Sequence, residues 1–361
     1  MTPRTSLFMQ DVKVLDLSRH LPGPMATLLM VDMGASVTKI EAPGGDEVRT
    51  LGPKDSAGRP VFFDTLSAGK ELLRIDLKSA QGTQQFLELV RNADVVVESF
   101  RPGVLQRLGL GYATLSKVNK GIIVCALNGF GSGGPWRDRA GHDLNYLALA
   151  GVLNRNRAGG APLPFEPPLA DSSASLFAVI AVLGALRARA RDGMGCEIDV
   201  ALGDAAMPLQ MLQIAEMRAG GEDPQPSGLF TGGAAYYASY ETLDGRYMAL
   251  GAVEPKFWSA FCSAAGHEEW IARQAEPLPQ TRLHAEVAGF FKSLSMAECE
   301  ARFADADCCL APVLTLQESL ATEHVRMRKL VRPGPSGGLQ ALLPLHVNGE
   351  PPALRGSVAG E

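Results

Sequence analysis

The sequence predicts an α/β protein with a large domain built on a mainly parallel sheet and a smaller α+β domain. Short apolar, β-branched runs alternate with helical runs in the first half of the chain. A stretch rich in Pro and Gly, Pro224–Gly233, then precedes a segment with a different pattern. The length of 361 residues also exceeds that of most single domains, so we expect two.

The large domain is predicted to be Rossmann-like, because its strands and helices follow one another in β-α-β order. Two of its strands, Val95–Glu98 and Ile122–Leu127, are apolar and β-branched, as expected for strands covered by helices on both faces. Ser79 is the expected N-cap of the helix at Ser79–Arg91. The predicted strands are Val12–Leu17, Ser36–Ile40, Arg74–Leu77, Val95–Glu98, Ile122–Leu127 and Cys196–Val200, and the predicted helices are Met25–Met33, Ser79–Arg91, Asp171–Asp192 and Ala201–Ala219.

The smaller domain is predicted to begin with a hairpin, in which Ala235–Thr242 and Tyr247–Gly251 flank the turn signal Asp244-Gly245. Helices are expected near Lys256–Ala265, Arg282–Ser293 and Met296–Ala304. We therefore predict a large domain at 1–190 and 320–361, linking helices at 191–227 and a small domain at 228–319.

The bulk composition gives no case for some classes of partner. The net charge of −5 offers no general attraction to nucleic acid. The apolar run Ala174–Leu186 is short for a bilayer span, so we expect a buried helix and no membrane partner. No His pair or Cys cluster has zinc spacing, so no metal site is predicted. Six cysteines without a C-x-x-C pair, after an N-terminus without an apolar signal region, predict reduced thiols and a cytoplasmic protein.

Three acid or base residues stand beside predicted helix starts. A lone His is commonly structural, but His142 follows the Gly-rich stretch Asn128–Pro135 and precedes a helix, where free backbone N–H groups can hold an oxyanion near Asp143. Asp171 can be an N-cap, or a carboxylate that moves a proton or attacks a carbonyl. Glu254 likewise can be a helix-start acid. The glycines lack the G-x-G-x-x-G spacing of a dinucleotide-binding loop, so we interpret them as letting the backbone pass close to a ligand or another strand.

Two further groups carry open alternatives. Lys39, Lys70, Lys78, Arg101 and Arg107 are individually ordinary surface charges, but all flank predicted strands, and α/β sheets bind phosphorylated ligands at strand ends. Three methionines share one predicted helical run, and they either pack in the core or form a pliable surface for apolar ligands: Met207, Met211 and Met217.

Several motifs in fixed order give a more specific signal than any single residue. On them the sequence resembles family III CoA-transferases (CaiB/BaiF-like), and within that family the α-methylacyl-CoA racemases. The motifs are Val14–Ser18, Leu21–Pro24, Asp32–Ala35, Val37–Glu41, Asp76–Ser79, Ala93–Glu98, Phe100–Gly103, Arg107–Leu110, Gly141–Tyr146, Gly232–Tyr237 and Gly251–Pro255.

The resemblance implies a function and a site. It implies racemisation of 2-methylacyl-CoA thioesters, with His142 and Asp171 as the two acid/base groups, Glu254 supporting the His, and Asp143 beside it. No cofactor is implied, because coenzyme A enters as part of the substrate. The implied CoA contacts are Lys39, Ile75, Asp76, Leu77, Lys78, Ser99, Phe100, Arg101, Pro102, Gly103, Arg107, Gly141, Leu144, Asn145 and Tyr146.

The resemblance also implies an interlocked homodimer, with each active site between the large domain of one chain and the small domain of the other. The alternative function is CoA transfer between carboxylic acids, in which Asp171 forms an anhydride with the acyl group and His142 is not needed. A third is a non-catalytic acyl-CoA-binding protein. The run Ser172–Ser175 departs from the family, which has glycines there.

Overall fold

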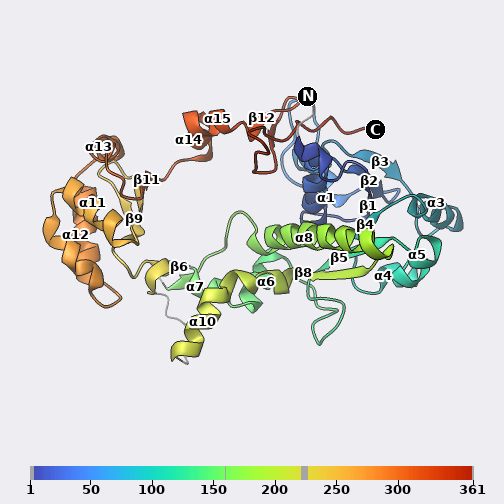
Figure 1. Ribbon diagram of the computed structural model, residues 1–361, viewed down its shortest axis with the longest axis horizontal. Helices are drawn as coiled ribbons and strands as arrows, with labels where there is room; N and C mark the ends of the chain where they lie inside the picture. Colours follow the sequence, from blue (N-terminus) through green and yellow to red (C-terminus); the bar gives the residue numbers. More distant parts are fainter. Residues whose placement is uncertain (1–3, 159, 221–226, 360–361) are drawn as a thin grey trace. The chain divides into compact units, whose positions relative to one another are not determined.

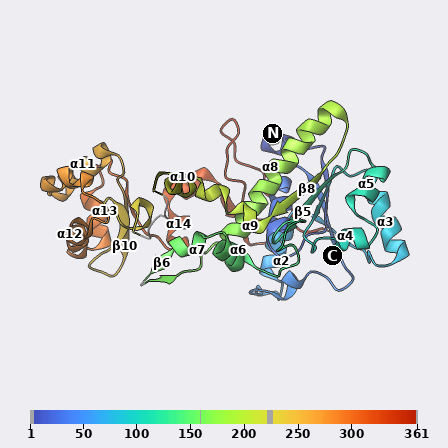
Figure 2. The same ribbon diagram turned by 90° about the horizontal axis from the view of Figure 1, so that it is seen from below.

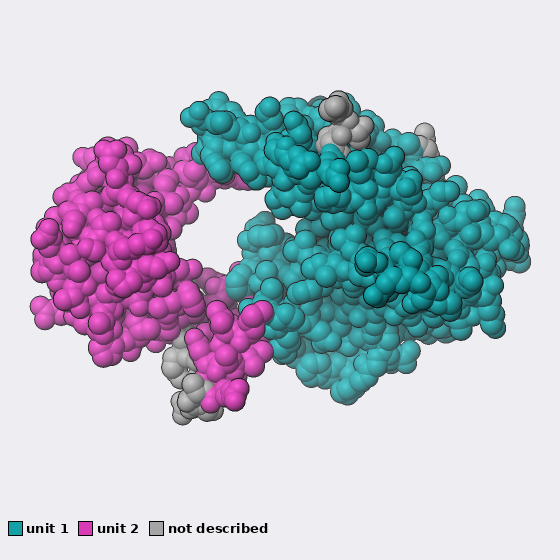
Figure 3. Space-filling view, viewed as in Figure 1, with its two compact units in different colours: residues 1–150, 165–209, 322–361 teal, residues 151–164, 210–321 magenta. Residues whose placement is uncertain are grey.

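The computed structural model describes residues 4–158, 160–220 and 227–359. The chain forms two compact units, coloured separately in Figure 3. Unit 1 comprises Met1–Ala150, Phe165–Leu209 and Thr322–Glu361, and unit 2 comprises Gly151–Pro164 and Gln210–Ala321. Residues 224–226 of the predicted linker lie outside the described residues. The domain boundaries expected from the sequence stay a prediction.

Unit 1 is built on a six-stranded sheet, which confirms the predicted α/β class (Figure 1). Every strand pair in it is parallel. The central strand β1 pairs with β2 on one side and β4 on the other, so that Val14 lies between Val37 and Val95. The order is β3-β2-β1-β4-β5-β8, with β1 at Lys13–Asp16, β2 at Ser36–Glu41, β3 at Glu71–Arg74, β4 at Val95–Glu98, β5 at Ile123–Asn128 and β8 at Glu197–Ala201.

Helices cover both faces of this sheet, which explains why the strands β4 and β5 are apolar at nearly every position (Figures 1 and 2). One face buries Phe86, Leu105 and Leu115 from its covering helices against the strands. That face carries α3 (Ala80–Val90), α4 (Val104–Arg107) and α5 (Tyr112–Val118), whereas α1 (Pro22–Asp32) and α8 (Leu169–Asp192) pack together on the other. Smaller elements of the unit are η1 (Arg4–Leu7), η2 (Glu47–Thr50), α2 (Val61–Ser67), α6 (Asp143–Leu149), α9 (Leu202–Ala205), α15 (Glu323–Arg328), β12 (Val331–Pro333) and β13 (Leu339–Ala341).

Helix α8 corrects two expectations. It runs for 24 residues and is long and apolar enough, by length and composition, to cross a membrane, so the prediction that its apolar run is too short is wrong. Its buried residues, such as Ala174 and Ala178, pack within unit 1 against α1 and β5. The helix begins at Leu169 after Pro168, so Asp171 lies in its first turn and is not the N-cap.

Two other predicted elements also differ. Strand β3 ends at Arg74, where it pairs with Glu41 at the end of β2, and the next residues turn because the Asp76 carboxylate accepts the Lys78 N–H at 3.0 Å. The long helix predicted at 201–219 is broken, since Pro208 has no N–H to donate. Its parts are α9, η3 (Pro208–Gln210) and α10 (Met211–Gly220).

A C-terminal segment of the described chain returns to unit 1. The Arg355 guanidinium donates to the Asp32 carboxylate at the end of α1, with both side chains buried and 2.7 Å between Nη2 and Oδ2. Leu343 donates its N–H to the same carboxylate at 2.7 Å. The Leu72 N–H donates to the carbonyl of Ala359, which extends the sheet beyond β3.

Unit 2 contains a three-stranded antiparallel sheet, and its hairpin confirms the turn predicted at Asp244-Gly245. Strand β11 (Leu310–Pro312), which was not predicted, pairs with β10. Stacked aromatic rings, among them Trp258, Phe261 and Phe291, fill the core between sheet and helices. The elements are α7 (Val152–Arg155), β6 (Arg157–Ala158), β7 (Ala161–Pro162), η4 (Leu229–Thr231), β9 (Tyr237–Glu241), β10 (Tyr247–Gly251), α11 (Pro255–Ala265), η5 (Glu268–Ala275), α12 (Thr281–Lys292), α13 (Met296–Arg302) and α14 (Leu316–Ala321).

Candidate active site

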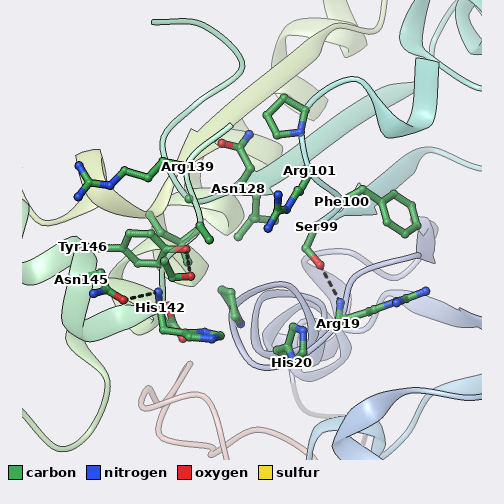
Figure 4. Close-up of a pocket in the computed structure, with 18 of the residues that line it drawn as sticks. Arg19, His20, Ser99, Phe100, Arg101, Asn128, Arg139, His142, Asn145 and Tyr146 are labelled. Atoms are coloured by element: carbon green, nitrogen blue, oxygen red, sulfur yellow. Dashed lines mark hydrogen bonds between the residues drawn. The ribbon is translucent and has the colours of Figure 1, made fainter. Parts of the chain in front are cut away.

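The candidate site lies at the carboxyl ends of the strands of unit 1. The sheet grows in one direction from β1 to β3 and in the other from β4 to β8, so the loops after β1 and β4 separate and leave a crevice. A cavity of about 460 Å³ occupies this position (Figure 4). It is lined from three strand ends: by Arg19 and His20 after β1, by Ser99–Pro102 after β4, and by Leu127–Gly129 at the end of β5.

The cavity brings together many of the residues singled out in the sequence. His142 and Asp171 both line it although they belong to different helices. The other predicted residues in its lining are Ser99, Phe100, Arg101, Pro102, Gly141, Asn145 and Tyr146.

His142 stands at the start of α6, as its position after the Gly-rich loop predicts. It is the N-cap residue, with an extended backbone, and its N–H donates to the Asn145 side-chain oxygen at 3.1 Å. This bond fixes the backbone from which the imidazole projects. Figure 4 shows the ring reaching toward the cavity, on the side of His20.

Asp143 holds the start of α8 in place. Its Oδ1 accepts the backbone N–H of Ala170 at 2.7 Å and that of Asp171 at 3.1 Å. These are two N–H groups in the first turn of α8, which have no partner within the helix itself. Asp143 therefore caps a second helix across 28 residues of sequence and positions the Asp171 backbone.

The Asp171 carboxyl is half-buried. Desolvation and, second, the negative charge of Asp143 raise its pKa to about 6. At neutral pH this carboxylate is mostly ionised, yet it holds a proton far more readily than an exposed aspartate. A group with such a pKa can both accept and donate a proton near neutrality.

Tyr146 packs under the Gly-rich loop. Its hydroxyl donates to the Gly141 carbonyl at 2.6 Å and its ring meets Phe130 edge-on at 5.2 Å. A Cβ added to Gly129 or Gly141 would lie 2.8 Å from atoms of this tyrosine. These two glycines thus make room for a side chain of the protein itself.

A second cavity, of about 290 Å³, contains the other predicted cluster. Ile75, Asp76, Leu77 and Lys78 line it. Arg19 and Phe100 line both cavities, so the two are neighbours at the β1 and β4 ends. The rest of the smaller cavity's lining is largely apolar, from Leu17, Ile40, Val104 and Leu108.

Six predicted site residues do not line these cavities. Lys39 is 2 % exposed, and its ammonium group lies 2.9 Å from the Asp46 carboxylate and 2.8 Å from the Ser18 carbonyl, which it donates to. The expectation that Lys39 contacts CoA is therefore wrong for this structure, because the covered strand β2 directs it inward. Lys70, a strand-end lysine that is not one of these six, likewise pairs with buried Asp16 at 3.0 Å. The others outside the lining are Gly103, Arg107, Asp143, the exposed Leu144, and Glu254, which lies in unit 2 as the N-cap of α11.

Sequence reasoning missed several residues of the main cavity. Arg19 and His20 follow β1 directly, so the rule that ligands bind at strand ends can find them. Arg137 and Arg139 belong to the loop after β5, and no local pattern distinguishes them from surface charges. The remaining lining residues that were not predicted are Pro22, Leu127, Asn128, Gly129, Ala140 and Leu202.

Comparison with known proteins extends over nearly the whole chain. The sequence matches the family described as CoA-transferase family III over residues 9–358. The chain belongs to CoA-transferase family III. A CaiB/BaiF family protein from Brucella suis has a similar crystal structure, with a TM-score of 0.84, 27% identity and coverage of 97% of this chain and 95% of that one.

The relatives in this family carry two kinds of name. The mouse α-methylacyl-CoA racemase is 33% identical over 326 residues, which cover 89% of this chain and 82% of the relative. A succinyl-CoA–D-citramalate CoA-transferase of Chloroflexus aurantiacus is 30% identical over 336 residues, covering 90% and 82%. The family is enzymatic, and it includes both racemases and CoA-transferases.

Proposed function

We propose that this protein racemises 2-methylacyl-CoA thioesters. The observation that carries the proposal is that His142 and Asp171 line one cavity and come from two different helices. Inversion at a carbon needs one group to remove the proton and another to return it on the opposite face. The pKa of Asp171, raised to about 6, suits both tasks.

The proposed reaction passes through an enolate. One of the two groups takes the α-proton of the thioester while the other delivers a proton to the far face, and the groups exchange roles for the opposite enantiomer. Backbone N–H groups near Asp143 stabilise the enolate oxygen, and one well-placed donor contributes about 3 kcal/mol. Coenzyme A enters with the substrate, and the proton transfers need no other cofactor.

The CoA moiety is proposed to bind along the two neighbouring cavities. The apolar smaller cavity at Ile75–Lys78 suits the adenine, and the turn Ser99–Gly103 connects it to the larger cavity. The thioester then lies beside Gly141–Tyr146. Lys39 is left out of this proposal because its side chain is buried and ion-paired.

A second candidate is CoA transfer, and the position of Asp171 favours it too. A mostly ionised carboxylate in a cavity can attack a thioester carbonyl, expel the CoA thiolate and form a mixed anhydride. The CoA thiolate then attacks the aspartyl carbonyl of the anhydride, which releases the donor acid and leaves an aspartyl-CoA thioester. The acceptor carboxylate attacks this thioester, and the thiolate it expels attacks the acceptor's carbonyl in the new anhydride, which gives the acceptor-CoA thioester and frees Asp171. This reaction requires Asp171 but gives no task to His142.

One assay separates these functions. The protein is incubated with each enantiomer of a 2-methylacyl-CoA in deuterated water, with and without an acceptor acid. A racemase incorporates deuterium at the α-carbon and inverts it without acceptor, whereas a transferase moves CoA only when the acid is present. If the protein binds CoA but catalyses neither CoA transfer nor α-proton exchange, the remaining function is that of a non-catalytic acyl-CoA-binding protein.

Two variants then test the residue roles. His142→Ala and Asp171→Ala should each abolish racemisation, and each can retain solvent exchange of a different enantiomer. Full racemisation by His142→Ala would refute the two-base mechanism. A transferase predicts instead that Asp171→Ala is inactive and His142→Ala nearly normal.

We further propose that the protein is an interlocked homodimer, in which Glu254 of one chain supports His142 of the other. What supports a dimer is the run from Met207 to Met217, whose large apolar side chains are exposed in the single chain. The exposed side chains are Met207, Leu209, Met211, Leu212, Ile214 and Met217.

A further inference from the structure

Two arginines, one at the end of a helix and one in a loop, meet beside Gly103. A Cβ placed on Gly103 would lie 3.1 Å from Nη2 of Arg137 and 3.2 Å from Nη1 of Arg107. Arg107 ends α4, after strand β4, whereas Arg137 belongs to the loop after β5. The fold thus brings two guanidinium groups, 30 positions apart in the sequence, to one point.

This arrangement places two like charges together without an anion of the protein between them. Among the residues that the structure describes, neither guanidinium has an ion-pair or hydrogen-bond partner, whereas Arg49, Arg189 and Arg355 of the same unit are paired with carboxylates. Converging cations repel each other until an anion joins them. Two guanidinium groups match the oxygens of a phosphate, which they bind through parallel N–H donors.

The pair lies between the two cavities of the candidate site. Arg137 lines the larger cavity. Val104, which begins the helix that Arg107 ends, and Leu108, which follows that helix, line the smaller one. Gly103 supports this position, since its φ of +83° favours glycine and the absence of a side chain leaves the space open.

We infer that Arg137, together with Arg107, forms a phosphate clamp for the CoA moiety, and that Arg137 is a binding residue of this protein. The inference rests on the proposed function, since it needs CoA in the two cavities. The phosphate is either one of the diphosphate that joins adenosine to pantetheine or the 3′-phosphate of the ribose. Both present the same chemistry to the two guanidinium groups.

The test uses calorimetric titration of the full chain with free CoA, with 3′-dephospho-CoA and with pantetheine. Arg137→Gln should weaken CoA binding about tenfold or more. Arg137→Lys should weaken it less, because lysine keeps the positive charge but lacks the parallel N–H donors of the guanidinium group. Arg191→Gln is the matched control, an exposed arginine in the last turn of α8, at the opposite end of that helix from Asp171. It should leave CoA affinity unchanged.

The two smaller ligands identify the phosphate. If the 3′-phosphate is bound, wild type and Arg137→Gln will bind 3′-dephospho-CoA equally; if the diphosphate is bound, the variant will weaken both nucleotides by the same factor. Pantetheine, which has no phosphate, should not distinguish the two proteins. Equal CoA affinity of wild type and a folded Arg137→Gln would overturn the clamp alone, whereas absence of CoA binding by wild type would overturn the proposed function itself.

Discussion

Asp143 acts on Asp171 in two opposing ways. Its carboxylate accepts the N–H groups that begin α8, which fixes the position of Asp171, while its negative charge makes Asp171 harder to ionise. These effects can be separated, because an asparagine side chain can accept the same N–H groups without carrying the charge.

Asp143→Asn is therefore expected to lower the pKa of Asp171 from about 6, since the like charge is removed. Where ionised Asp171 acts as the base, kcat/KM rises with pH through this pKa, so the acid limb of the profile should move to lower pH. The measurement is the pH dependence of α-proton exchange. The control is Asp192→Asn, near the other end of α8, which should leave the acid limb of the profile in place. An acid limb that does not move in Asp143→Asn would refute the electrostatic coupling between Asp143 and Asp171.

Glu98 is a second carboxyl with a shifted pKa, and it ends strand β4 directly before the Ser99–Gly103 turn. Burial, the largest cause, raises its pKa to about 7, with smaller contributions from Asp199 and Glu197, although the Phe100 N–H that it accepts at 2.6 Å opposes the shift. A carboxyl that holds its proton more tightly when folded stabilises the protein at low pH. This contribution is complete below about pH 4.5 and is lost as the pH rises through about 7.

Glu98→Gln should remove this pH dependence, because glutamine does not titrate and its oxygen can still accept the Phe100 N–H. Unfolding by urea between pH 4 and 8 measures it. The free energy of unfolding of the variant should exceed that of wild type by up to roughly 3 kcal/mol at pH 8, and the two values should approach each other at pH 4. Parallel stability curves for the two proteins would contradict the raised pKa.

The sequence predicts single residues at this site only where local signals suffice. His142 is recognisable because a Gly-rich loop and a helical run flank it. The capping of α8 by Asp143 joins positions 28 residues apart, and the meeting of Arg107 and Arg137 depends on the order of the strands. Lys39 was misassigned because a strand-end lysine and a buried, paired lysine look the same in sequence.

At the scale of elements, α10 differs from the helix that the sequence predicts. Pro208 separates it from α9, and its large apolar side chains are exposed, so the interpretation of Met207, Met211 and Met217 as core residues is wrong. That they contact the acyl chain stays a prediction. An apolar helix surface of this kind is expected to be covered in an assembly.

Charged residues on α10 should therefore change the assembly rather than the fold. Met211→Asp with Ile214→Asp is expected to convert the proposed dimer to monomers, because both side chains are more than half exposed in the single chain. Sedimentation velocity measures the mass, and Met211→Leu with Ile214→Leu is the control that keeps the surface apolar. A monomeric wild type, or an unchanged dimer in the Asp variant, would refute this interface.

Element boundaries were less predictable than element types. The parallel strands and the hairpin of unit 2 follow from apolar runs and turn residues, which are local features. The end of β3 is set by pairing with β2, and β11 has only three residues, so neither boundary is visible as a sequence pattern. The β-α-β alternation of the sequence correctly predicted the parallel sheet as a whole.

At the scale of the whole molecule, Arg355 joins the C-terminal segment to unit 1 through buried Asp32. Arg355→Met would leave this carboxylate unpaired in the interior, which costs roughly 3–5 kcal/mol. Thermal unfolding should show a destabilised unit 1. Adding Asp32→Asn should restore part of the stability, since asparagine is neutral and can accept the Leu343 N–H. Equal destabilisation of the single and the double variant would exclude the ion pair as the cause.

The sequence positions of Asp32 and Arg355 also determine when this ion pair can first form during translation. The ribosome synthesises Asp32 323 residues before the arginine that neutralises it, and all of unit 2 is made in between. The six strands of the sheet can pair as soon as β8 has been made. Until the C-terminal segment emerges, however, the Asp32 carboxylate at the end of α1 has no cation beside it, and the edge strand β3 lacks its contact with Ala359. Unit 2 can thus complete its core on the ribosome before unit 1 does, although unit 1 begins first.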